Sequence, residues 1–286
     1  MSGNVLYDAP GPRIRRLERW GSIVFGLIIL GLLAWLVSSL SARGIFDDRW
    51  AVYTDPPKGQ SAEDVWRSLL VTGLGATLRA AVVAAPIALV LALLLSILRT
   101  STLALVRRPA IAVIELLRGM PVLLMMFFGL LGFGLSSFEA VVFGLALYNA
   151  AIVAEILRAG LTALPRGQAE AGTALGLTRW QTLRIIQLPQ VVRLMLPSLI
   201  SQFVVLLKDS SLGFIVGYPE LLSIMKTNYS FFGNDSRLPL FAAVVVIYLA
   251  VNLALTRIAV FVERRFSSRG QKGVKVPLVV GTGQAV

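Results

Sequence analysis

Long apolar runs are the feature of this sequence that most restricts its fold. A run of about 18 or more apolar residues can cross the hydrocarbon core of a bilayer as a helix. Only helices and closed barrels satisfy their backbone hydrogen bonds in lipid. The runs cover residues 23–40, 68–98, 109–135, 137–158, 194–217 and 239–262. The sequence therefore predicts an all-α polytopic membrane protein with six transmembrane helices.

The first run has an alternative interpretation as a cleaved secretory signal. The apolar core of a signal is about 7–15 residues long and ends in a small-residue cleavage site. The run at 23–40 is longer and has no clear site, so we expect a retained helix. We expect residues 1–67 to form a basic segment, the first transmembrane helix and an outer loop. Residues 68–262 then form the core, and residues 263–286 form a basic, disordered cytoplasmic tail.

The start of the third run is ambiguous. Glu115, Arg118, Gly119 and Pro121 interrupt its first half. Residues 109–118 could form an amphipathic cytoplasmic helix, with the span beginning near Gly119. Glycine and proline there would weaken the helix and expose backbone carbonyls, as broken helices in transporters do.

Cysteine and histidine are both absent from the sequence. Their absence excludes disulfide frameworks, thiolate or imidazole metal sites, iron–sulfur clusters and histidine-based catalytic triads. The phosphate-binding pattern G-x-x-x-x-G-K-[ST] does not occur either. We therefore expect no catalytic residue, no metal site and no cofactor on this chain.

The net charge of +12 is unevenly distributed over the predicted spans. The side that carries both termini has 17 basic and 4 acidic residues, and the opposite side has 6 basic and 8 acidic residues. Short loops rich in Lys and Arg stay in the cytoplasm. The charge thus predicts a multi-pass protein of the cell membrane with both termini cytoplasmic, and it gives no reason to expect a nucleic-acid partner.

The cytoplasmic segment at 159–193 has helical signals of its own. Glu170 suits the first turn of a short helix over 168–175, because the helix dipole favours an acid there. Gly176 can end that helix in a left-handed conformation, and Thr178 can cap a second helix over 179–187. Such a pair of helices could form a rigid knob that contacts another protein. It could equally lie on the inner leaflet, anchored by Trp180.

The same segment carries a spaced motif. Glu-Ala-x-x-x-x-Gly, then nine residues, then Ile-x-Leu-Pro, resembles the "EAA" loop of binding-protein-dependent ABC importer permeases. Gly172 stands where that family usually has Ala. The motif residues here are Glu170, Ala171, Gly176, Ile186, Leu188 and Pro189. In that family the loop, here residues 165–190, forms the coupling helix that docks into the cytoplasmic ATPase. The resemblance implies ATPase coupling by Glu170, Ala171, Gly176, Leu177 and Trp180.

Further stretches resemble the polar-amino-acid branch of this family. Residues 115–121, 154–160 and 206–212 resemble its "ELLRGTP", "AEIFRGG" and "LLKDTSL" motifs, and residues 219–221 resemble its "x-E-L". The sequence is most similar to glutamate-importer permeases of actinobacteria. The resemblance implies the type I importer fold and an amino-acid substrate, first glutamate or aspartate. It also implies an ATPase dimer that binds ATP and magnesium, a second permease (a related chain or a homodimer) and an extracellular solute-binding protein.

Polar residues inside the spans are candidates for the translocation path, because charges in a bilayer pair or line a path. Glu155 could pair with Arg158, and Glu115 with Arg118, at helical spacing. Lys208 and Asp209 could form a salt bridge between helices. Alternatively, Lys208 could hold a substrate carboxylate while a neighbouring serine donates a hydrogen bond. Arg79 could hold a second carboxylate or snorkel to the interface. The candidate path residues are Lys208, Asp209, Ser210, Ser211, Arg79, Arg118 and Glu155.

The function that these features predict is the membrane-spanning permease of an ATP-driven importer working by alternating access. The alternative is a secondary transporter driven by an ion gradient, in which Glu115, Glu155 and Asp209 would bind the coupling ion. A channel subunit or scaffold is a third class. A membrane-embedded enzyme is disfavoured because no nucleophile–base pair is present.

Overall fold

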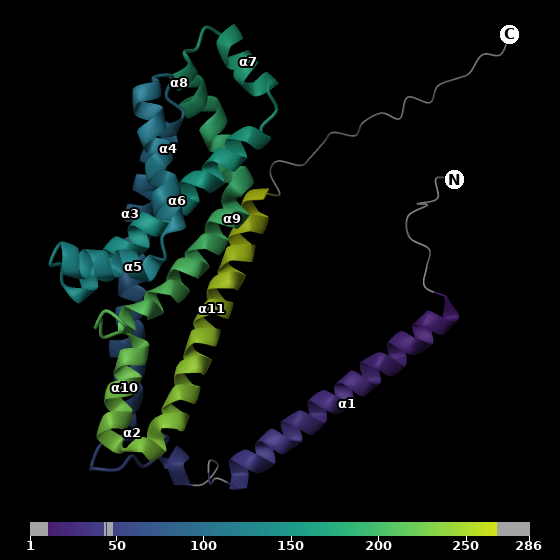
Figure 1. The fold of residues 1–286 in the computed structure, drawn as a ribbon, viewed down its shortest axis with the longest axis vertical. Coiled ribbons are helices and arrows are strands. Elements are labelled where there is room, and N and C mark those ends of the chain that lie inside the picture. Colours follow the sequence, from purple (N-terminus) through teal and green to yellow (C-terminus); the bar gives the residue numbers. More distant parts are fainter. Residues whose placement is uncertain (1–10, 43, 45–47, 268–286) are drawn as a thin grey trace. The chain divides into compact units, whose positions relative to one another are not determined.

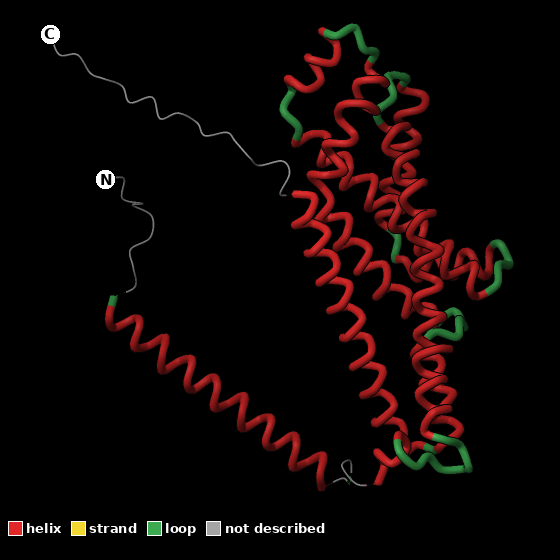
Figure 2. Tube along the Cα trace, turned by 180° about the vertical axis from the view of Figure 1, so that it is seen from behind, coloured by secondary structure: helices red, strands yellow, loops and turns green. Residues whose placement is uncertain are grey.

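The computed structural model describes residues 11–42, 44 and 48–267, and every regular element among them is a helix. Figures 1 and 2 show these helices from opposite sides. They form two units, Met1–Ala62 and Glu63–Val286. The division between these units falls at the first residue of the continuous helical stretch Ala62–Arg99, whereas the sequence-based division at residue 67 lies inside that stretch and stays a prediction.

The first unit contains α1 (Pro12–Ala42) and the 3₁₀ helix η1 (Asp48–Tyr53). The stretch Arg16–Ala42 has a mean hydropathy of 2.6, and none of that apolar stretch is buried within the protein. A helix that is apolar on all sides requires an apolar surrounding. The expected helix at 23–40 is therefore present and long enough to span a bilayer, and its retention in the mature protein stays a prediction.

The second unit, Glu63–Val286, contains all the remaining described helices. Its elements are α2 (Ala62–Arg67), η2 (Ser68–Leu74), α3 (Gly75–Arg99), α4 (Ala104–Gly119), α5 (Val122–Phe127), η3 (Phe128–Gly132), α6 (Ser137–Ala163), α7 (Gly167–Ala174), α8 (Arg179–Gln181), η4 (Thr182–Gln187), α9 (Leu188–Asp209), η5 (Ser210–Phe214), α10 (Leu221–Phe232), η6 (Asn234–Ser236) and α11 (Arg237–Ser267). In Figure 1, α7 and α8 lie at one end of this unit, and α2 and α10 lie at the other.

A sharp bend interrupts the predicted third span. Within the described residues, five helical stretches are long and apolar enough to cross a membrane, and a bent pair gives a sixth. The pair is α4 with Val122–Gly132, which meet at 105°. Met120 and Pro121 have extended backbones between them. Proline disfavours a helical conformation for the residue before it, which explains why α4 ends at Gly119. The predicted break in this helix is confirmed.

Small residues bring α3 and α6 together at the centre of the unit. Ala80, Ala84, Ala88 and Ala92 recur every four residues on one face of α3, and all four are buried. On α6, Ala150 and Ala154 are also buried, in the same core cluster as Ala92. Without large side chains the two backbones can approach closely, which is how membrane helices gain van der Waals contact.

Two helix ends differ from the sequence prediction. The span expected at 194–217 contains a helix that ends at Asp209 and continues as the 3₁₀ turn η5. The last span was expected to end at residue 262, but α11 continues to Ser267. Glu and Arg are good helix formers, so residues 263–265 extend the helix instead of beginning the tail. The rest of the expected tail, residues 268–286, lies outside the described residues.

Candidate functional site

The coupling segment, residues 165–190, folds locally as the sequence predicted. Glu170 lies in the first turn of α7. Gly176 has φ +74°, and the N–H of Leu177 donates to the Gly172 carbonyl at 3.1 Å. This geometry is the Schellman motif, which favours glycine at the left-handed position. Thr178 then caps α8 in a reciprocal pair of hydrogen bonds with Gln181. The segment is thus a rigid helix–turn–helix.

The turn of this segment presents small and apolar side chains to the outside. Glu170, Ala171 and Gly176 are exposed. Leu175 and Trp180 are 76% and 46% exposed, while Leu177 is half-buried. Large apolar side chains that remain exposed next to small residues are typical of a surface that contacts a partner.

Gly172 has a packing reason at the position where the resembled motif usually has Ala. A Cβ at Gly172 would lie 2.5 Å from both Cγ2 and Oγ1 of Thr182. Real Cβ atoms do not approach that closely, so an alanine here would force the Thr182 side chain or α7 to shift. The buried Thr182 hydroxyl has no hydrogen-bond partner among the described residues. Glycine in place of the usual alanine at position 172 therefore leaves the space that the Thr182 side chain of η4 occupies.

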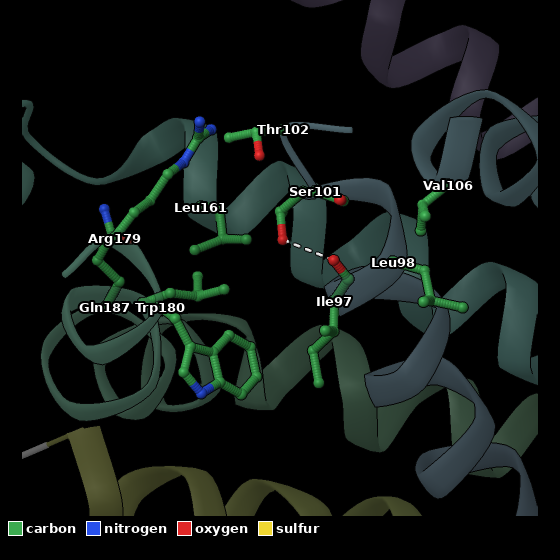
Figure 3. Close-up of a pocket in the computed structure, with 11 residues that line it drawn as sticks. Ile97, Leu98, Ser101, Thr102, Val106, Leu161, Arg179, Trp180 and Gln187 are labelled. Atoms are coloured by element: carbon green, nitrogen blue, oxygen red, sulfur yellow. Dashed lines mark hydrogen bonds between the residues drawn. The ribbon is translucent and has the colours of Figure 1, made fainter. Parts of the chain in front are cut away.

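A cavity of about 480 Å³ separates the coupling segment from the end of α3 (Figure 3). Arg179 and Trp180 line it on the coupling side, and Ile97, Ser101 and Leu161 line it from α3, the following loop and α6. α7 and α8 pack instead on η4, and η4 continues directly into α9. The coupling segment is therefore attached to the bundle chiefly through α9.

Glu155 is the centre of an ion-pair network that joins three helices. Its carboxylate accepts a hydrogen bond from Arg99 of α3 at 2.8 Å and from Arg158 of α6 at 2.6 Å. Arg118 of α4 lies 3.8 Å from Glu155 and 2.6 Å from Glu115. Both predicted pairs at helical spacing are present. The contacts support the structural alternative for Arg118 and Glu155, whose role in the translocation path stays a prediction.

Arg99 was missing from the sequence-based set, although it completes this network. It is the last residue of α3, where a basic residue interacts favourably with the helix dipole. Nothing in its sequence neighbourhood points to Glu155, which lies 56 residues away. The only available signal was the position of both residues near the predicted cytoplasmic ends of their spans.

The polar segment at the end of α9 divides into a capping part and an accessible part. Ser210 is fully buried, and its hydroxyl donates to the Leu207 carbonyl at 2.6 Å. It therefore stabilises the helix end, and a substrate contact through Ser210 stays a prediction. The Ser211 hydroxyl likewise donates to the Lys208 carbonyl, at 2.7 Å. Lys208 is exposed, and in the part of the chain that the structure describes neither it nor Asp209 forms an ion pair. The salt bridge considered as an alternative is thus absent there.

Arg79 lies over an aromatic ring. Its guanidinium carbon is 4.7 Å from the ring centre of Phe138, and the ring centres of Phe138 and Tyr218 are 5.7 Å apart. Burial raises the pKa of Tyr218, and the positive charge of Arg79 partly opposes that change. Leu207 and Leu212, which flank the polar segment, belong to the same core cluster as Phe138 and Tyr218. Arg79, through Phe138, and the end of α9, through Leu207, therefore pack against the same core cluster.

Glu220 is a buried carboxylate that the sequence analysis did not single out as a site residue. It caps α10 by accepting the Ser223 N–H, and Tyr248 of α11 donates to its other oxygen, both at 2.9 Å. Burial raises its pKa, and these hydrogen bonds pull the pKa back down. The acid one residue before α10 was the available signal for a cap.

Comparison with known proteins now adds to this geometry. Residues 83–268 match the family model "Binding-protein-dependent transport system inner membrane component". The chain belongs to this family. It is therefore a permease component of an amino-acid ABC importer, a multi-pass membrane protein and not an enzyme, and ATP hydrolysis resides on a separate chain.

Individual relatives point the same way. The chain is 37% identical to the "Glutamate transport system permease protein GluD" of Corynebacterium glutamicum, over 83% of this chain and 88% of the relative. It is 32% identical to the "Glutamate/aspartate import permease protein GltK" of Escherichia coli, over 68% and 92%. A solved structure described as an "amino acid ABC transporter with histidines" matches with a TM-score of 0.64 and 30% identity, over 70% of this permease and 95% of that chain.

Proposed function

We propose that this permease imports acidic amino acids, glutamate first, by alternating access driven by ATP. The names of the relatives GluD and GltK support this substrate class. The site chemistry supports it too, because Arg79 and Lys208 are two cationic side chains without an ion-pair partner among the described residues. A dicarboxylic amino acid offers two anionic groups for such residues.

The observation that carries the mechanism is the continuous helical path from the coupling segment to the polar segment. η4 and α9 run without interruption from Thr182 to Asp209. At about 1.5 Å per residue this path is about 40 Å long. A displacement of the coupling segment would therefore be transmitted along this path toward Lys208 and Asp209, with Pro197 inside α9 as the point where the path can bend.

In this proposal a dimeric ATPase binds ATP and magnesium and moves the coupling segment through Glu170, Ala171, Gly176, Leu177 and Trp180. The permease itself holds no cofactor. A second permease, identical or related, completes the path, and an external solute-binding protein delivers the amino acid. Both termini lie in the cytoplasm, as the charge distribution predicts. Because ATP can shift the equilibrium only through contacts that differ between the two states, the docked surface must change on closure.

Reconstitution tests this function. The chain is placed in proteoliposomes with the ATPase, the binding protein and any second permease encoded beside it. Labelled glutamate should accumulate only with internal ATP and the binding protein. Glu170→Lys should abolish uptake and ATPase association, while the substitution Arg107→Gln at an exposed position of α4, outside the coupling segment, should leave both intact. Uptake that survives ATP depletion and collapses with an uncoupler would instead establish an ion-driven transporter.

A further inference from the structure

A second cavity, mostly apolar but with two basic side chains in its lining, lies far from the coupling segment. It has a volume of about 530 Å³ and is formed by α10, η6, the first turns of α11 and the end of η5. Figure 1 shows α10 beside the start of α11, at the opposite end of the unit from α7 and α8. Lys226 and Arg237 line this cavity together with Phe214, Tyr229, Leu238 and Phe241. The charge distribution predicts that this end faces the outside.

Both cations are held on aromatic faces and not by acids. Lys226 Nζ lies 5.4 Å from the ring centre of Phe214, and Arg237 Cζ lies 5.4 Å from that of Tyr229. Within the described ranges 11–42, 44 and 48–267, neither forms an ion pair. Asp235, the acid nearest in sequence, is exposed and pairs with neither cation. Aromatic faces orient a cation without neutralising it, so two positive charges remain available to one anion.

An apolar surface continues from this cavity along α11. Leu238, Phe241, Val245 and Leu249 are exposed, and their spacing of three or four residues places them on one face. The apolar helical stretch Asn234–Ile258 begins in η6 and continues into α11. Arg237 therefore lies near the start of this stretch, where we expect the membrane interface. An occupant that matches the whole surface needs an anionic head and an apolar tail.

We propose that this cavity binds the phosphate headgroup of an anionic phospholipid of the outer leaflet, with one acyl chain along the exposed face of α11. Lys226 and Arg237 contact the phosphate, and Leu238 and Phe241 contact the upper part of the chain. A free amino acid would leave the apolar face uncovered. Carboxylates of a docked binding protein would meet the two cations but not the lipid-facing side chains below them.

Native mass spectrometry of the full chain in a neutral detergent tests this proposal, with phosphatidylglycerol and phosphatidylcholine of equal chain length as probes. Each interfacial charge changes anionic-lipid affinity about fivefold, so Lys226→Gln combined with Arg237→Gln should weaken phosphatidylglycerol binding about 30-fold. The matched control Arg67→Gln removes an exposed outer-side charge that does not line the cavity, and it should leave binding unchanged. Lys226→Arg combined with Arg237→Lys preserves both charges and should retain the affinity.

Three results would overturn the proposal. The first is equal affinity for the two lipids, and the second is unchanged phosphatidylglycerol binding in a folded double variant. The third is displacement of the lipid by inorganic phosphate or glutamate at matched concentration, which would identify a site for soluble anions. A double variant that binds lipid normally but no longer responds to the binding protein would assign the two cations to protein docking instead.

Discussion

Glu155→Gln tests whether the ion-pair network holds α3, α4 and α6 together. The side chains of Arg99 and Glu155 are only 18% and 21% exposed, whereas that of Arg158 is 42% exposed. Removing one partner of a fully buried pair costs about 3–5 kcal/mol, and an exposed pair contributes about 0.2–1 kcal/mol. The largely buried Arg99 pair should therefore contribute about 2 kcal/mol and the Arg158 pair about 0.5 kcal/mol.

The assay is thermal unfolding of the purified chain in detergent. A loss of about 2.5 kcal/mol should lower Tm by about 5–10 °C for a chain of this size. Glu115→Gln is the control, because it breaks only the exposed pair with Arg118 and should lower Tm by about 1–2 °C. In a double-mutant cycle, Arg99→Gln and Glu155→Gln should show a coupling energy of about 1–2 kcal/mol.

Equal melting of Glu155→Gln and wild-type protein would refute this reasoning. If that variant melts normally but changes the concentration dependence of uptake, Glu155 belongs to the translocation path, which is the alternative that the sequence left open. A variant that loses stability and keeps the concentration dependence of uptake is the expected result.

Three further substitutions give separate tests. Gly172→Ala places a methyl group 2.5 Å from Thr182 and should destabilise the chain by about 1–3 kcal/mol, and adding Thr182→Ala should restore most of that loss in the same melting assay. For Glu220, burial raises the folded pKa above the ordinary 4.5, so the contribution of this carboxyl to stability should fall as pH rises from about 4.5 through the raised pKa. Glu220→Gln should flatten that part of a melting series between pH 4 and pH 8, and an unchanged slope would contradict the assignment. Lys208→Gln breaks no ion pair seen here, so it should keep Tm and reduce glutamate uptake at least about tenfold; normal uptake would exclude Lys208 as a carboxylate contact.

The coupling segment is the part of the site that could be predicted residue by residue. Its first helix, the left-handed Gly176 and the Thr178 cap all depend on hydrogen bonds between residues at most five positions apart. Such contacts form wherever the local sequence allows them. The break at Pro121 is predictable for the same reason, because the proline ring acts on its immediate neighbour.

The polar segment at the end of α9 shows where prediction from sequence fails. In the sequence, residues 208–211 form a run of four polar side chains within an apolar stretch, and nothing in the sequence distinguishes one from another. The structure buries Ser210 completely and leaves Lys208 exposed. Which side of a helix end is covered depends on the elements packed against it, here α3 and α6 through a shared core cluster. Helical spacing alone does not contain that information.

The sequence by itself determined the class of this protein, because the length and apolarity of a run decide whether it can cross a bilayer. It also determined the family, through a motif whose residues lie in one segment. Only the tertiary structure decided that Glu155 pairs with Arg99, that Gly172 faces Thr182, and that Lys226 and Arg237 share a cavity. The physical reason is that these contacts join surfaces of different elements. Their energies depend on how the helices approach one another, and no periodicity along a single helix specifies which neighbour it will have.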